Sequence, residues 1–189
     1  MSQERYQVRF EWGEAGAARI AAGVHAIVVV DELDGHGQAS AASLAAAIAE
    51  RATGGQSGTA ALAGGAAVLC ATEASAADAA TRILRLQEEL GDRCVVAIVA
   101  AGSLDADGAR TAVEDLLAAG AVVDALAERG LDFASPEAAA AAAAWQGLRR
   151  ATAHLLTAST SGGHLADARA QRDAHPSTVV TLREFSPRA

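Results

Sequence analysis

Acidic side chains at the end of one apolar segment are the clearest candidates for chemistry in this sequence. Residues 26–30 read Ala-Ile-Val-Val-Val, and Asp31, Glu32 and Asp34 follow directly. A short β-branched run closed by polar residues is typical of a buried parallel strand, and ligands of open α/β sheets bind at the carboxyl ends of such strands. Carboxylates suit a hard cation such as Mg²⁺. The pattern therefore predicts a carboxylate-based site at Asp31.

Three other kinds of site do not fit this segment. Phosphatases that form an aspartyl-phosphate need a second acid two residues after the first, and Leu33 stands at that position. A dinucleotide fold needs a glycine-rich turn directly after the strand, where Asp31 and Glu32 would repel a pyrophosphate. The sequence also has no serine or cysteine in a nucleophile elbow and no two histidines four residues apart. A carboxylate-based site remains.

A glycine-rich turn at 53–59 offers a different kind of ligand contact. Ser57, Gly58 and Thr59 carry small hydroxyls and an unhindered backbone, which can wrap an anion with N–H groups. A plain linker would have the same composition. The segment lacks the Gly-Lys-Ser/Thr ending of a P-loop. A second turn of this kind, at 161–164, is expected to join two helices.

Composition excludes two classes of partner. The chain of 189 residues has a net charge of -8 and no cluster of lysine or arginine, so it lacks the electrostatic footprint of a nucleic-acid-binding protein. We find neither a targeting segment nor a run of about 20 apolar residues, and we expect a cytoplasmic protein with no membrane partner. Cys70 and Cys94 lie in apolar runs and are expected to be reduced and to pack in the core. Alanine-rich helices leave small patches that a second copy could cover, which favours a homodimer.

Apolar periodicity predicts strands that alternate with helices. We expect strands at 6–11, 26–30, 66–71, 95–100 and 178–182, and helices at 13–22, 39–51, 75–90, 111–130 and 136–156. Thr111 and Glu114 have the spacing of a helix capping box, and Ser135 before Pro136 is a strong helix start. Such alternation indicates an α/β fold with a largely parallel sheet, and the length favours a single domain over 1–189.

Five short motifs occur in a recognisable order. They are Val-Val-Val-Asp at 28–31, Gly-Ala-Ala-Val-Leu at 65–69, a strand that ends in Ala-Gly at 96–102, a Glu-Asp pair before Gly-Ala within 112–121, and Ser-Pro-Glu-Ala-Ala at 135–139. In this order they resemble the ComB-like family of 2-phosphosulfolactate phosphatases, Mg²⁺-dependent enzymes of coenzyme M biosynthesis. The similarity covers roughly residues 6–160, and its second half is the clearer one.

The resemblance implies a three-layer α/β/α fold with a mostly parallel sheet and a site for a small phosphorylated organic acid. It implies Asp31 and Glu114 as catalytic residues. Asp31, Glu114 and Asp115 would hold the Mg²⁺ ion. The residues expected to bind substrate are Ser57, Gly58, Thr59, Gly102 and Arg110.

Helix geometry and local context offer simpler roles for several of these acids. Glu114 could close the capping box with Thr111 instead of binding a metal. Asp115 lies about 100° further round the helix, so both acids cannot point into one pocket, and one of them is expected to be a solvated surface charge. Glu32 and Asp34 are expected to lie in a solvated turn.

The loop after Asp31 leaves more than one function open. Where the family has a hydroxyl-rich segment that supplies phosphate donors, this chain has acids from Glu32 onward and a loop histidine, His36. The main alternative is a non-catalytic relative, an α/β binding or dimerisation module. A third reading is a Mg²⁺-dependent hydrolase for a different small phosphorylated acid.

Overall fold

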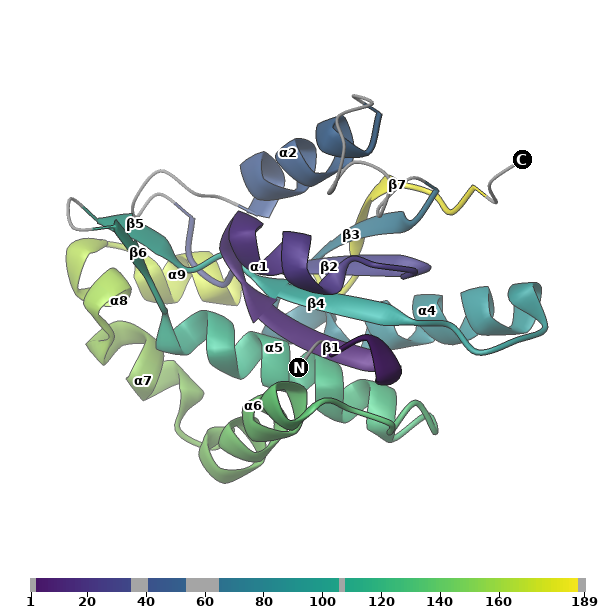
Figure 1. Ribbon diagram of the computed structural model, residues 1–189. Coiled ribbons are helices and arrows are strands. Elements are labelled where there is room, and N and C mark those ends of the chain that lie inside the picture. Colours follow the sequence, from purple (N-terminus) through teal and green to yellow (C-terminus); the bar gives the residue numbers. More distant parts are fainter. Residues whose placement is uncertain (1–2, 35–40, 54–64, 106–107, 187–189) are drawn as a thin grey trace.

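Five strands form one sheet at the centre of the protein. The computed structural model describes residues 3–34, 41–53, 65–105 and 108–186. The sheet has the order β1-β4-β2-β3-β7; its first four strands are parallel, and β7 lies antiparallel to β3 (Figure 1). The strands are β1 (Val8–Trp12), β2 (Ala26–Val30), β3 (Ala67–Ala71), β4 (Val96–Ala100) and β7 (Val180–Arg183). The α/β fold with a mostly parallel sheet is therefore confirmed.

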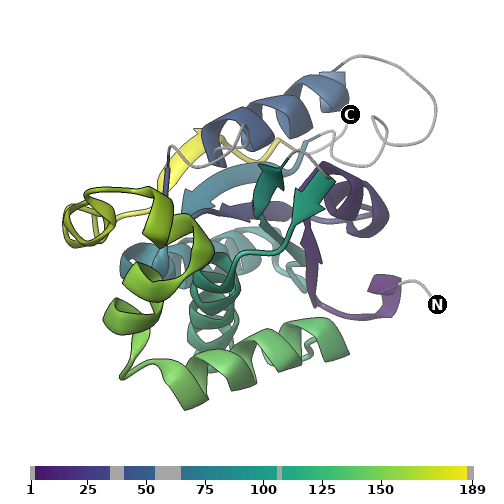
Figure 2. The same cartoon turned by 90° about the vertical axis from the view of Figure 1, so that its left-hand side faces the viewer.

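Helices cover both faces of the sheet, as the two views in Figures 1 and 2 show. The helices α1 (Gly13–Ile20) and α2 (Ala41–Thr53) pack on one face. The helices α4 (Ala76–Leu90) and α5 (Val113–Ala127) pack on the other, and α6 (Pro136–Leu148) lies against α5. Within the described residues, no helix is long and apolar enough to cross a lipid bilayer.

Short elements complete the chain. They are η1 (Gln3–Arg5), η2 (Glu73–Ser75), the hairpin of β5 (Ser103–Asp105) and β6 (Gly108–Arg110), and the helices α7 (Thr152–Ala158), α8 (Thr160–His164) and α9 (Ala168–Asp173). In Figure 2 the helices α7 to α9 lie on the same side of the molecule, below β7 and beside α5.

The strand β2 shows how the apolar pattern builds two cores. All five of its residues are buried, because β4 and β3 flank it and helices cover both of its faces. Val28 and Val30 join the core beneath α4 and α5, whereas Ile27 and Val29 join the core beneath α1 and α2. The predicted bounds 26–30 are confirmed at both ends.

Helix starts were predicted with mixed success. The Ser135 hydroxyl accepts a hydrogen bond from the Ala138 N–H at 3.2 Å, which confirms the predicted cap. The predicted capping box of Thr111 and Glu114 is wrong, because α5 begins at Val113 and Ala112 occupies the capping position. The long helix expected at 136–156 is also interrupted, since α6 ends at Leu148 and α7 begins at Thr152.

The topology creates a switch point between two neighbouring strands. The chain leaves β2 toward α2 on one face of the sheet, whereas it leaves β4 through the hairpin toward α5 on the opposite face. In open α/β sheets, the loops that diverge in this way leave a crevice at the carboxyl ends of the two strands, where ligands bind. The site predicted at Asp31 lies at this edge.

Candidate functional site

A buried aspartate fills the crevice between the ends of β2 and β4. The Asp115 Oδ1 atom accepts a hydrogen bond from the Glu32 N–H at 2.9 Å, and its Oδ2 atom accepts one from the Gly102 N–H at 2.8 Å. Asp115 is only 2% exposed, and burial together with the nearby Asp31 raises its pKa well above the usual range. This side chain therefore ties the two diverging loops together and divides the carboxyl edge into two parts.

A close approach between two backbone segments requires a glycine at position 102. Its φ angle is +66°, and a Cβ atom would lie 2.6 Å from the carbonyl oxygen of Arg110. The approach arises because β5 and β6 form an antiparallel hairpin in which Ser103 pairs with Arg110. Gly102, predicted to bind substrate, has its N–H engaged by Asp115 and so positions the hairpin that carries Arg110.

The first part of this edge is a cavity of about 540 Å³ between the hairpin, α5 and the start of α8, called here the Arg110 cavity. Trp12, Arg110 and Glu114 line it. The Arg110 guanidinium donates to the Thr111 carbonyl oxygen from Nη1 at 3.3 Å and to the Ser161 hydroxyl from Nη2 at 3.2 Å. These bonds hold the cation in the wall of a cavity that a buried acid also lines.

Glu114 is the acid of the Arg110 cavity. It is the second residue of α5 and is 4% exposed, and its Oε2 atom has no hydrogen-bond partner in the described part of the chain. An unpartnered buried carboxylate oxygen is costly, so such atoms commonly serve a ligand or a reaction. Glu114 and Asp115 do point to different places, as helix geometry predicts. The prediction that one of them is a surface charge is wrong, because both are buried.

The second part of the edge is a cavity of about 250 Å³ at the ends of β2 and β3, called here the Asp31 cavity. Asp31, Asp34, Cys70, Thr72 and His175 are among its lining residues. Asp34 is exposed, as expected for a turn. Burial and the two aspartates raise the pKa of the Cys70 thiol to about 11, so this cysteine stays a neutral thiol.

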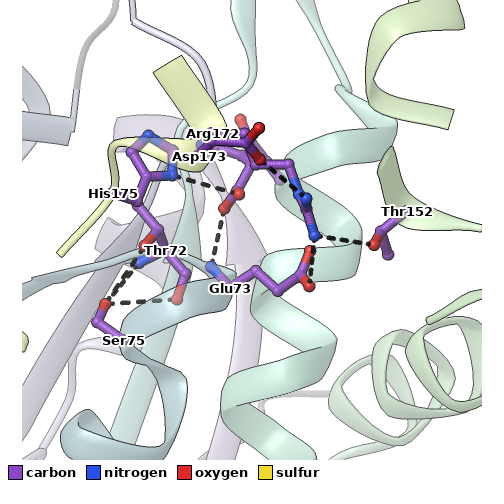
Figure 3. Close-up of polar contacts among 9 residues, drawn as sticks. Thr72, Glu73, Ser75, Thr152, Arg172, Asp173 and His175 are labelled. Carbon is purple, nitrogen blue, oxygen red and sulfur yellow. Dashed lines mark hydrogen bonds and ion pairs between the residues drawn. The ribbon is translucent and has the colours of Figure 1, made fainter. Parts of the chain in front are cut away.

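A charged network joins the Asp31 cavity to the carboxyl-terminal part of the chain (Figure 3). The Glu32 Oε2 atom accepts a hydrogen bond from the Glu73 N–H at 2.8 Å, and its Oε1 atom lies 3.4 Å from the His175 Nδ1 atom. The Arg172 guanidinium in turn lies 3.3 Å from the Glu73 carboxylate. Glu32 raises the pKa of His175 above its usual value, against the effect of burial.

Sequence reasoning missed this network. Glu32 was expected in a solvated turn, yet it is 2% exposed and binds residues from two distant segments. The available signal was weak: side chains alternate across the pleat, so an acid two residues after the end of a buried strand can face the same core as the last strand residue. The partners could not be identified, because His175 and Arg172 meet Glu32 and Glu73 only through the fold.

No protein family and no curated protein matches this chain.

The predicted Mg²⁺ ligands do not share one cavity. Asp31 lines one cavity, Glu114 lines the other, and both Asp115 oxygens accept backbone N–H groups between them. Among the residues that the structure describes, no group of three or more His, Cys, Asp or Glu side chains could hold a metal ion. The described residues therefore do not fit a Mg²⁺ site. Ser57, Gly58, Thr59 and His36 lie outside the described residues.

Proposed function

We propose that this chain binds a small phosphorylated organic acid in the Arg110 cavity and hydrolyses it to an alcohol and phosphate. This is the activity implied by the resemblance to the 2-phosphosulfolactate phosphatases. The observation that carries the proposal is that Arg110 and the unpartnered Oε2 atom of Glu114 belong to residues lining one cavity. That cavity supplies a cation for the phosphate and a carboxylate for the attacking water.

Binding would rest on Arg110 and on the amino end of α5. A guanidinium binds phosphate oxygens through two parallel hydrogen bonds, which a lysine cannot do. The first N–H groups of a helix lack intrahelical acceptors and carry the positive end of its dipole, and Val113 and Glu114 at this end of α5 line the cavity. The Trp12 ring forms an apolar wall for the carbon part of the substrate.

Glu114 would act as general base in this reaction. Its carboxylate accepts a proton from water while the water oxygen bonds to phosphorus and the ester P–O bond breaks. The proton then passes to the oxygen of the leaving alcohol, so phosphate and a neutral alcohol result. Arg110 offsets the charge on the phosphoryl oxygens in the transition state, where most of the rate enhancement for this reaction arises.

The test is phosphate release from a panel of phosphomonoesters of small carboxylic and sulfonic acids. The assay is run with Mg²⁺ and with a chelator, because the resemblance implies this ion. We expect Arg110→Ala to lower kcat/KM by about 100-fold and Glu114→Gln to lower kcat by a similar factor. Arg149→Ala is the matched control, because Arg149 is exposed at the end of α6. Release that is abolished by Asp31→Ala but unaffected by Arg110→Ala would move the reaction to the Asp31 cavity.

A second candidate, a non-catalytic binding module, is favoured by the separation of the acids. A phosphatase of the family that the sequence resembles would use Asp31 and Glu114 together, yet they line different cavities. A binding module requires only the Arg110 side. Calorimetric titration with the same esters distinguishes the two functions: heat of binding that Arg110→Ala removes, with no phosphate released, supports the module.

A further inference from the structure

Glu32 is held in a position that serves His175. Its carboxylate is almost fully buried, and one oxygen is fixed by the Glu73 N–H. The other oxygen, Oε1, makes no hydrogen bond with any described residue and faces the His175 Nδ1 atom at 3.4 Å. Burying a carboxylate is costly unless it is paired. The arrangement therefore gives Glu32 Oε1 one partner, the imidazole.

The imidazole presents its second nitrogen away from this contact. In Figure 3 a dashed line leaves one ring nitrogen of His175, which is the Nδ1 atom paired with Glu32, and none leaves the other ring nitrogen. His175 also lines the Asp31 cavity and is 18% exposed. The contact of Nδ1 with Glu32 is an ion pair at 3.4 Å and not a hydrogen bond, and it leaves the Nε2 atom available as a base. A histidine next to a buried carboxylate in this way is an arrangement found in many hydrolases.

Further contacts fix this pair from several elements. Arg172 in α9 pairs with Glu73, and its Nη2 atom lies 3.5 Å from the Thr152 hydroxyl in α7. The Glu32 backbone N–H is bound by Asp115 from α5. The base and its orienting carboxylate are thus placed by α5, α7, α9 and η2 together, and such rigid support is what proton transfer requires.

The lining of the Asp31 cavity indicates the charge of its substrate. Asp31 and Asp34 are acidic, and among the described lining residues only His175 can carry a positive charge. An anion such as a phosphomonoester would be repelled. Val180 and Leu182 add apolar surface, and Thr72 adds a hydroxyl that can donate to a carbonyl oxygen. An uncharged substrate with a short apolar group and one carbonyl fits these walls.

Water is the nucleophile that this cavity leaves available. The raised pKa of Cys70 keeps its thiol neutral. The Ser75 hydroxyl is engaged as an acceptor of the Thr72 N–H at 2.9 Å. A histidine base can activate a water molecule in their place.

We propose that the Asp31 cavity is a second active site, where His175 acts as general base and Glu32 as its positioning residue in the hydrolysis of small uncharged carboxylic esters. The Nε2 atom takes a proton from water as the water oxygen bonds to the carbonyl carbon. The ester C–O bond then breaks, and the proton passes to the leaving alkoxide, so an acid and an alcohol form. The proposal does not depend on phosphatase activity in the Arg110 cavity, since these esters contain no phosphate.

The test measures hydrolysis of p-nitrophenyl acetate and butyrate by the full chain. We expect His175→Ala to lower kcat by about 100-fold, and added imidazole to restore part of that loss after subtraction of the rate with imidazole alone. His154→Gln is the control, because His154 is exposed on α7, away from both cavities. Glu32→Gln should lower kcat and leave KM nearly unchanged, because it affects only the orientation of the base.

Three results would overturn the proposal. The first is a wild-type rate of ester hydrolysis that is no higher than the rate of the double variant His154→Gln, His175→Ala. The second is a His175→Ala rate equal to that of the wild type. The third is a loss in His175→Ala that imidazole does not restore, because a structural histidine would not be replaced by a diffusible base. His175→Gln, which retains a polar side chain of similar size, is measured in parallel. If His175→Ala does not fold, the kcat of His175→Gln is compared with that of the wild type instead.

Discussion

The Arg110 cavity and the Asp31 cavity lie at the same edge of the sheet, yet they differ in charge and in support. The Arg110 cavity combines a cation with one buried acid, and both come from neighbouring segments around the start of α5. The Asp31 cavity combines two aspartates with a histidine, and the histidine comes from the segment after α9, near the carboxyl end of the chain. The proposed phosphate binding depends on the first of these environments, and the proposed ester hydrolysis depends on the second.

Asp115 keeps these two environments apart. Because its carboxylate occupies the N–H groups at the ends of both loops, the switch-point crevice holds a side chain where related folds hold a ligand. Ligands are therefore expected in the Arg110 cavity or in the Asp31 cavity, on either side of Asp115. One sheet edge can in this way support two separate chemistries, provided that the dividing residue remains in place.

Replacement of Asp115 is expected to have the largest effect on the arrangement of the two cavities. Asp115→Ala leaves the Glu32 and Gly102 N–H groups buried without acceptors, and we expect it to lower the free energy of unfolding by about 4 kcal/mol. Asp115→Asn should cost less, because its amide still accepts one of the two bonds. Urea denaturation checks both variants. Asp124→Ala, with an exposed contact on the same helix, is the control, and an equal loss there would contradict the role given to Asp115.

A change at Gly102 tests the close backbone approach on the Arg110 side. Gly102→Ala places a Cβ atom against the Arg110 carbonyl oxygen in addition to the strain of a positive φ, so we expect a loss of about 3 kcal/mol in the free energy of unfolding. Gly91→Ala separates these causes, because Gly91 has a φ of +63° with open space around its Cβ position. Its expected loss is about 1 kcal/mol. Thermal or urea unfolding of the two variants measures the difference, and equal losses would show that the close approach has no cost.

Local patterns predicted the fold far better than they predicted the site. The strand 26–30 and the cap at Ser135 depend on residues adjacent in sequence, and both are confirmed. The capping box failed because α5 is buried on nearly every side, between the sheet and α6, so packing decides where it begins. The same packing buries both Glu114 and Asp115, which sequence reasoning divided between a site and the surface.

The candidate site residues are brought together by tertiary contacts, which the spacing of residues along the sequence does not reveal. Arg110 and Glu114 are close in sequence, and the structure places both in the lining of one cavity, while their functional roles remain predictions. The division between Asp31 and Glu114 follows from the orientation of α5 against two strand ends, which periodicity does not specify. The contact of Glu32 with His175 requires the whole chain to fold back on itself.

Loss of the ion pair between Arg172 and Glu73 tests how much this pair stabilises the surroundings of the Asp31 cavity. Arg172→Met keeps the apolar stem but leaves the half-buried Glu73 carboxylate without its cation, and we expect the free energy of unfolding to fall by about 1 kcal/mol. Arg169→Met is the control, because the Arg169 pair with Asp173 is exposed and spans 3.8 Å. The unfolding free energies should differ less at high salt, since part of the Arg172 contribution is screened. No difference between the two variants at low salt would show that α9 is not fastened through this pair.

The smallest expected effect is a pH-dependent contribution of His175 to stability. Glu32 raises the pKa of His175 in the folded protein, so the folded state binds the proton more tightly than the unfolded chain does. The stabilisation is fully present below about pH 6.5, the ordinary imidazole pKa, and is lost as the pH rises through the raised value. We expect it to amount to less than about 1 kcal/mol, because the imidazole is partly exposed to solvent. The unfolding free energy of the wild type minus that of His175→Gln should therefore decline across this range. The same difference measured in a Glu32→Gln background should decline less, because only the weaker effect of Asp31 then raises the pKa of His175, and an undiminished decline would show that Glu32 is not the main cause.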